Sequence, residues 1–480
     1  MADNTPIMQR AMPYLTVAVW SFAELFGGAT RVGMDNDLLV QLVSAPLLVL
    51  ALFCLFGERR YAGARPYVLS IALVVILICL QLVPLPPEIW TRLGSREVAE
   101  IVYTTAGIPL PWLPVSLVPG LTKFALASLI APVAIFCGTL VMARDGKLFL
   151  IIVPVAVATL HVFVGVGQFN NAANEYWSST IALYVPGEAY GYFANRNHYA
   201  ASNYAMIPLA FGWLLALRSE PRRFGILWAI AGAAAIALFL IGLSIAYSRA
   251  GAAIGAATIG MCAALYFKTR DRAEVPRGVS IAILAAIIVV SLVFIVGIAS
   301  LVGERGVAYS IRGVFVEKTL GLIAGAPIFG YGLGSFVPLY MTTELPTEIN
   351  RYFANHAHND WLEIVLDTGL FGAVALLVFT CWIAFRTMRM WIFDRPSGAL
   401  GTFALAASIT VVGLLAHSVL DYPLRTTALA STFAACCAMI AAVAAGWDRQ
   451  RTAERPMKVD APAGDERRHR SRSRRQPAGT

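Results

Sequence analysis

The segment His356-Ala-His-Asn-Asp-Trp-Leu-Glu363 places two histidines close to two carboxylates. Near pH 7 a neutral imidazole can take a proton from an attacking hydroxyl group, and Asp360 or Glu363 could orient the ring. The two carboxylates are also spaced as a helix N-cap and its N3 partner, so they could simply begin a helix. A His-x-His pattern can bind zinc, although the carboxylates here do not complete a typical zinc site. The segment predicts a general base, which could be His356 or His358.

More polar side chains lie at the ends of long apolar segments. Arginine presents a planar fork of donors that matches phosphate oxygens, so several arginines at one membrane face suit a diphosphate. Each arginine alone could also be an interfacial residue that snorkels to water. Because ionisable groups in and near a membrane are costly and these share one side of it, we expect a common site. The residues are Asn195, Arg196, His198, Arg249, Arg312, His417, Asp421 and Arg425.

Other candidate residues have simpler interpretations. His417 and Asp421 lie one helical turn apart and could bond only each other. His161 stands alone in an apolar segment, and we expect it to be a packing residue. The seven cysteines fall in apolar runs without metal-ligand spacing, which predicts small core residues.

The elements that position these residues are predicted to be membrane-spanning helices. Hydrophobic residues make up 58% of the chain and charged residues 14%, with a mean hydropathy of +0.69. Apolar runs of about 20 residues recur, which is enough to cross a bilayer. The first run has no cleavage-type site and reads as a span rather than a signal peptide. We predict an all-α polytopic membrane protein with about 12 transmembrane helices, near residues 11–29, 37–56, 66–84, 121–142, 147–168, 196–217, 223–247, 250–267, 278–302, 369–392, 399–419 and 426–446.

Length and charge test this arrangement. Residues 224–267 contain no acidic residue, and Arg249 is their only basic residue. As one helix this segment would be about 66 Å long, which is twice the thickness of the bilayer core. The segment therefore predicts two helices joined by a hairpin near residues 248–251. With a cytoplasmic N-terminus, most of the 37 Lys and Arg fall in segments that face the cytoplasm. Both termini are therefore expected to be cytoplasmic, and the candidate site to lie outside.

Three segments lie outside the predicted spans. Residues 85–120 are rich in proline, so we expect an irregular loop held at the interface by Trp90 and Trp112. Residues 303–368 form the largest loop, with short helices, between the ninth and tenth helices; an amphipathic helix begins near Arg312, and glycine-rich turns follow it. Residues 447–480 are predicted to be a disordered basic cytoplasmic tail that is attracted to anionic lipid rather than nucleic acid.

The chain resembles the O-antigen ligase and O-antigen polymerase superfamily, bacterial membrane glycosyltransferases that move glycans from an undecaprenyl diphosphate carrier on the periplasmic face. The resemblance covers about residues 190–430, within a membrane domain of residues 1–446. It rests on the order and shared side of several motifs, which are Phe193-Ala-Asn-Arg-Asn-His198, Ser248-Arg-Ala-Gly251, Arg312 with Pro327-Ile-Phe-Gly-Tyr-Gly-Leu-Gly-Ser-Phe336, His358-Asn-Asp-Trp-Leu-Glu363, and His417 to Arg425.

The resemblance implies a metal-independent, inverting glycosyl transfer without a cofactor, in the bacterial inner membrane. Arg249 and Arg312 would hold the diphosphate as its charge grows, and His358 would deprotonate or orient the acceptor hydroxyl. These three are the expected catalytic residues. The expected substrate-binding residues are Arg196, Asn195, His198, His356, Asn359, Asp421 and Arg425.

The acceptor stays open within this superfamily. A ligase gives the glycan to lipid A–core, and a polymerase gives it to another carrier-linked unit; we favour the ligase. Arg249 and Gly260 have the Arg-x10-Gly spacing described for polymerases, but such a match is common in a Gly/Ala-rich helix. A 12-span secondary transporter is the alternative from another class. The sequence has no clear internal repeat and its spans are apolar at the midplane, which argues against a transporter.

Overall fold

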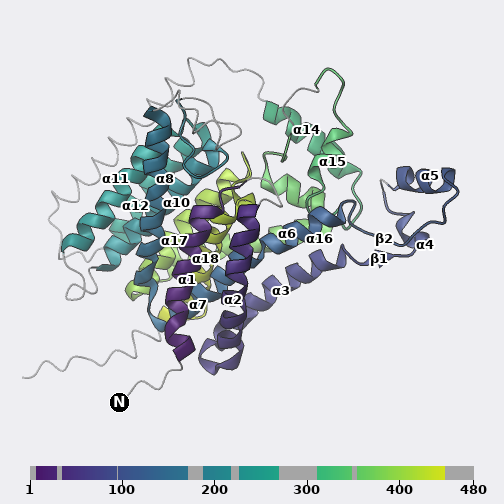
Figure 1. The fold of residues 1–480 in the computed structure, drawn as a ribbon. Coiled ribbons are helices and arrows are strands. Elements are labelled where there is room, and N and C mark those ends of the chain that lie inside the picture. Colours follow the sequence, from purple (N-terminus) through teal and green to yellow (C-terminus); the bar gives the residue numbers. More distant parts are fainter. Residues whose placement is uncertain are drawn as a thin grey trace, which may run out of the picture.

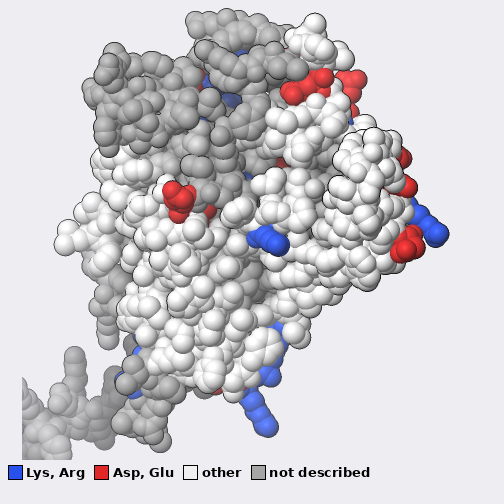
Figure 2. Space-filling view, turned by 45° about the vertical axis from the view of Figure 1, so that its right-hand side comes forward, with Lys and Arg blue, Asp and Glu red and all other residues white. Residues whose placement is uncertain are grey.

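The computed structural model describes residues 7–29, 35–94, 96–170, 187–217, 226–269, 311–348 and 354–448. Across these ranges the chain is almost entirely helical, and ten of the helices in them are long and apolar enough to cross a membrane. Most of the surface that the described residues form in Figure 2 carries no charged side chain. The prediction of an all-α polytopic membrane protein is therefore confirmed.

The first part of the chain alternates long helices with short connecting elements (Figure 1). Its elements are α1 (Ile7–Phe26), α2 (Asp35–Gly57), η1 (Arg59–Ala64), α3 (Arg65–Leu80), β1 (Pro84–Leu85), α4 (Pro87–Trp90), α5 (Glu97–Thr105), β2 (Leu113–Pro114), α6 (Pro119–Ser128), α7 (Ile130–Asp145), η2 (Leu148–Ile151) and α8 (Ile152–Asn170).

The second part holds the motif-bearing helices. Its described elements are α10 (Arg196–Leu217), α11 (Ile226–Ile245), α12 (Arg249–Thr269), α14 (Ile311–Ala324), α15 (Phe336–Met341), α16 (Asp360–Met388), η3 (Arg389–Phe393), α17 (Gly398–His417), η4 (Pro423–Arg425) and α18 (Thr427–Ala444). The hairpin predicted at residues 248–251 is present, since α11 ends at Ile245 and α12 begins at Arg249.

Two predicted spans and the predicted tail need separate comment. Residues 11–29 fall largely in α1, which is helical but too polar to count among the ten apolar helices. Residues 278–302 and almost all of the basic tail lie outside the described residues.

The centre of the bundle is formed by α7, α10, α17 and α18, whose side chains are mostly buried. Small residues allow close packing there: a Cβ atom on Gly212 of α10 would lie 2.6 Å from the Cβ of Ala406 in α17. Helices that approach this closely gain van der Waals contact, which drives helix association in a membrane. By contrast, α3 and α16 bury few of their side chains.

Helix α16 bends at Gly369, where φ is +62° and ψ is −148°. The bend packs against the loop before α15: a Cβ atom on Gly369 would lie 2.4 Å from the backbone nitrogen of Gly330, itself at φ +71°. Only glycine fits both positions without strain. The bend falls at the predicted boundary between the large outside loop and the tenth span.

Residues 85–120 are more ordered than predicted. Strands β1 and β2 pair antiparallel, and α4 and α5 lie between them. Trp90 is fully buried and donates to the carbonyl oxygen of Pro111 at 2.8 Å, whereas Trp112 is 65% exposed. The expectation that both tryptophans face the interface is therefore wrong for Trp90, because its indole closes this loop instead.

Candidate functional site

The buried carboxylate of Asp421 joins four segments that are far apart in the sequence. It lies between α17 and η4, and its side chain has no exposed surface. Asn197 Nδ2 donates to Oδ2 at 2.6 Å, Arg312 Nη2 donates to Oδ2 at 2.9 Å, and His358 Nδ1 lies 3.1 Å from Oδ1. Asp421 therefore brings the start of α10, the start of α14 and the loop before α16 to one point.

The same contacts keep Asp421 ionised. Burial raises the pKa of this carboxyl, but the hydrogen bond from His358 and the charges of the neighbouring histidines and Arg312 lower it by more. The net pKa lies well below the usual range of aspartate. An ionised carboxylate only accepts, so Nδ1 of His358 carries the proton in this hydrogen bond.

His358 is held in a strained and specific position. Its backbone has φ +50°, a conformation that is uncommon outside glycine, and its ring stacks on Phe315 with centroids 5.4 Å apart. About a fifth of the side chain is exposed. With Nδ1 bound to Asp421, the lone pair of Nε2 can accept a proton from a substrate, as a general base must.

Arg312 can serve both Asp421 and a ligand. Only Nη2 is engaged with Asp421 in the described contacts, and 36% of the side chain remains exposed. The rest of the guanidinium fork is therefore available to a phosphate group.

Arg249 borders this cluster rather than joining it. It is the first residue of α12, is exposed, and makes no hydrogen bond or ion pair with the described residues. Two residues later, a Cβ atom on Gly251 would lie 2.5 Å from the Cβ of Ala200, one turn of α10 beyond Asn197. The N-terminal turn of α12 thus lies beside the start of α10.

The α10 motif mainly builds the walls of the site. Arg196 forms an ion pair with Glu188, and Asn195 Oδ1 accepts from the backbone N–H of Asn197 at 2.8 Å. His198 is fully buried, with Nε2 3.9 Å from Asp421 Oδ1. Arg196 is therefore already paired, and Asn195 shapes the first turn of α10.

A second cluster lies on the first turns of α16. Asp360, Glu363 and Asp367 share one face of the helix and surround the guanidinium of Arg425. Arg425 Nε, Nη2 and Nη1 lie 3.3, 3.5 and 3.6 Å from oxygens of Asp360, Glu363 and Asp367. Burial lowers the pKa of Arg425, but the three carboxylates raise it by more, so the guanidinium stays charged. Arg425 thus neutralises carboxylates, although the sequence suggested a phosphate contact.

The helix start differs from the predicted capping pair. Asn359 is the N-cap of α16: its side chain accepts from Leu362 N at 3.1 Å, and its amide donates to Val419 O at 3.0 Å. Glu363 accepts from Ala357 N at 2.8 Å and pairs with His356 Nδ1 at 2.7 Å. The hypothesis that Asp360 and Glu363 form the capping pair is therefore wrong, because the chain enters the helix one residue earlier.

Tyr422 contacts histidines of both clusters. Its ring lies 4.8 Å from that of His358, 4.7 Å from that of His198 and 4.4 Å from that of His356, measured between centroids. Of these histidines, His356 bonds Glu363 and His358 bonds Asp421. This placement distinguishes two histidines that the sequence left equivalent.

Sequence reasoning missed Asn197, Phe315, Asp367 and Tyr422. Only Asp367 had a visible signal, because it follows Asp360 by two helical turns on the same face.

The residues with simpler interpretations can also be placed. His161 is buried and packs against Phe193, as predicted. His417 bonds the Tyr204 hydroxyl at 3.0 Å, and not the side chain of Asp421. The cysteines are free; Cys79 and Cys381 are exposed rather than in the core.

Residues 234–377 match the family model described as O-antigen ligase. The matched region includes Arg249, Arg312, His356 and His358, and it confirms the resemblance to the O-antigen ligase and polymerase superfamily. A comparison with curated proteins found no match. The chain is thus a multi-pass membrane protein with a region that is similar to an enzymatic, glycan-transferring family.

Proposed function

We propose that this protein transfers a glycan from an undecaprenyl-diphosphate carrier to a hydroxyl group of lipid A–core, as an O-antigen ligase. One observation carries the proposal: Arg312 and His358, a phosphate-binding group and a base, both bond the buried carboxylate of Asp421, at 2.9 and 3.1 Å. Shared anchoring fixes the two groups relative to each other, which is what a displacement at one sugar carbon requires.

In this mechanism the acceptor oxygen attacks the anomeric carbon while the bond from that carbon to the carrier phosphate breaks. The proton of the acceptor passes to Nε2 of His358, and Asp421 stabilises the imidazolium that forms. The diphosphate leaves on its lipid, and Arg312 and Arg249 stabilise its growing negative charge without a metal. Attack from the side opposite the leaving group inverts the configuration.

The location of the site supports an extracytoplasmic reaction. The starts of α10 and α12, the start of α14 and the end of α17 meet at one end of the bundle, where the Asp421 cluster lies. The distribution of Lys and Arg along the chain favours the periplasmic side for that end. A donor with a lipid tail and a hydrated glycan would react at this boundary. The large loop that carries α14 and α15 would act as its lid.

The test is deletion of the gene in its native host, with analysis of lipopolysaccharide and carrier-linked glycans by gel and mass spectrometry. We expect long glycan to disappear from lipid A–core and polymer to accumulate on the carrier. Complementation with His358→Ala should not restore transfer, whereas wild type should. Single repeat units in place of polymer would instead indicate a polymerase, and unchanged pools would contradict both.

A further inference from the structure

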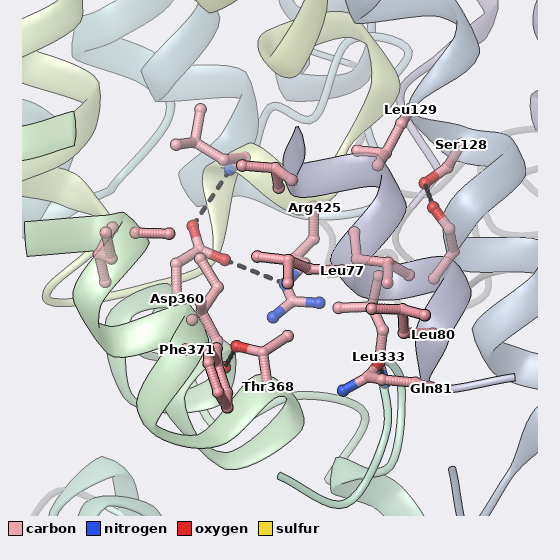
Figure 3. A pocket seen from close by; sticks show the side chains of 18 of the residues that line it. Leu77, Leu80, Gln81, Ser128, Leu129, Leu333, Asp360, Thr368, Phe371 and Arg425 are labelled. Carbon is pink, nitrogen blue, oxygen red and sulfur yellow. Dashed lines mark hydrogen bonds and ion pairs between the residues drawn. The ribbon is translucent and has the colours of Figure 1, made fainter. Parts of the chain in front are cut away.

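A cavity of about 730 Å³ lies next to the candidate site, between α3, α6 and α16. Its volume falls within the range of small-molecule sites, which is about 300–1,000 Å³. Figure 3 shows Leu77 and Leu80 of α3 across from Thr368 and Phe371 of α16, with Arg425 between them. The lining is mostly apolar, with few polar groups.

The cavity extends along α3 and α16, which contact each other near each end of α3. At one end the rings of Tyr67 and Trp382 lie 5.5 Å apart. At the other, Gln81 Nε2 donates to the carbonyl oxygen of Asp367 at 2.9 Å. Helix α3 has 16 residues, so the space between these clamps is about 20 Å long. An apolar space of this shape beside a bilayer suits a hydrocarbon chain.

One end of the cavity approaches the candidate base. His356, Asp360 and Arg425 line it, and the ring of Tyr422 contacts both His356 and His358. A lipid in the cavity would therefore present its head group one aromatic ring away from His358.

The charges there disfavour a diphosphate. Asp37 lines the cavity, is 93% buried, and bonds Thr427 at 3.0 Å without a cationic partner among the described residues. Arg425 also lines the cavity but is already shared among three carboxylates. Two carboxylates that face the cavity, Asp37 and Asp360, would repel an anionic diphosphate, whereas carboxylates readily accept hydrogen bonds from sugar hydroxyls.

The arginines that suit the diphosphate lie elsewhere. In Figure 1, α10, α11 and α12 lie on one side of α17 and α18, while α3, α6 and α16 lie on the other. Arg249 begins α12, and Arg312 bonds Asp421; none of these three residues lines the cavity. In an inverting displacement the acceptor must approach from the side opposite the leaving group.

We propose that this cavity holds a hydrocarbon chain of the acceptor, so that the acceptor is recognised as a lipid and not only as a glycan. This inference rests on the proposed function and extends it, because it places the acceptor lipid in a cavity that neither Arg249 nor Arg312 lines. The donor tail and a structural phospholipid are the competing occupants.

The experiment uses the purified full-length protein in detergent with the undecaprenyl-diphosphate-linked glycan as donor. The acceptors are lipid A–core and the same oligosaccharide after removal of its acyl chains. For wild type we expect a KM about tenfold or more higher for the deacylated acceptor. Ala375→Trp would fill the cavity from α16 and raise the KM for acylated acceptor about tenfold, while the donor KM stays unchanged.

Controls separate occlusion of the cavity from misfolding. Val378→Trp places the same side chain on the 62%-exposed outer face of α16 and should leave both KM values unchanged. Leu77→Trp fills the cavity from α3 and should reproduce the effect of Ala375→Trp. Both cavity variants should leave the KM for the deacylated acceptor unchanged. A misfolded variant would instead have impaired transfer to both acceptors.

The outcomes distinguish the two proposals. A raised donor KM in the cavity variants would assign the cavity to the donor tail and overturn the inference. Equal KM values for the two acceptors, or no effect of either tryptophan, would also overturn it, although transfer itself would still support the proposed function. No transfer by wild type to either acceptor would overturn the proposed function, and the inference with it.

Discussion

Replacement of Asp421 by asparagine tests whether the shared carboxylate organises the site. The substitution keeps the shape of the side chain but removes its negative charge. The carboxylate of Asp421 accepts hydrogen bonds from Arg312 at 2.9 Å and from His358 at 3.1 Å. A hydrogen bond to a charged group contributes about 1.5–3 kcal/mol and a neutral one about 1 kcal/mol. Two such losses raise the barrier by about 1–4 kcal/mol, which corresponds to a fall in kcat/KM of roughly 5- to 1,000-fold.

The assay is transfer of glycan from the undecaprenyl-diphosphate donor to lipid A–core by purified protein. Asp394→Asn is the matched control, because that carboxylate pairs with Arg389 at 2.9 Å near the other end of α16 and should keep wild-type kinetics. If Asp421 acts through His358, Asp421→Asn should add less than tenfold to the loss in His358→Ala. A full further 100-fold loss in that background, or wild-type activity of Asp421→Asn, would refute the reasoning.

Three further predictions concern the surrounding structure. Arg425→Met leaves three buried carboxylates without a cation and should lower the free energy of unfolding by about 3–5 kcal/mol. Unfolding of the purified protein in detergent measures this change. Arg92→Met, at an exposed position, is the control and should have little effect. Gly330→Ala forces a Cβ atom to within 2.5 Å of backbone atoms in α16 at φ +71°, and should destabilise the protein by about 1–3 kcal/mol, whereas Gly321→Ala, with nothing within 4 Å, should not. Arg249→Ala should lower kcat/KM for the donor by roughly 10- to 100-fold without changing stability; a value within about twofold of wild type would remove it from the mechanism.

The sequence by itself determined the membrane architecture, because the length of an apolar run and the thickness of a bilayer decide whether a segment can span. It located the hairpin before Arg249, since residues 224–267 are too long for one span, and α11 and α12 meet there. It also predicted that a span begins near residue 369, which is where α16 bends at Gly369. The family motifs were readable for the same reason: they are local strings of residues.

The tertiary structure alone decided which polar groups meet. Asp421 bonds residues 224, 109 and 63 positions away in the chain, and a sequence carries no record of such pairings. His356 and His358 are chemically alike and two residues apart, so their difference comes only from the carboxylates that packing places beside them, Glu363 and Asp421. The pairing of Arg425 with carboxylates depends likewise on how η4 docks against α16. Local rules describe single helices, whereas these contacts depend on the rotation and depth of each helix against its neighbours.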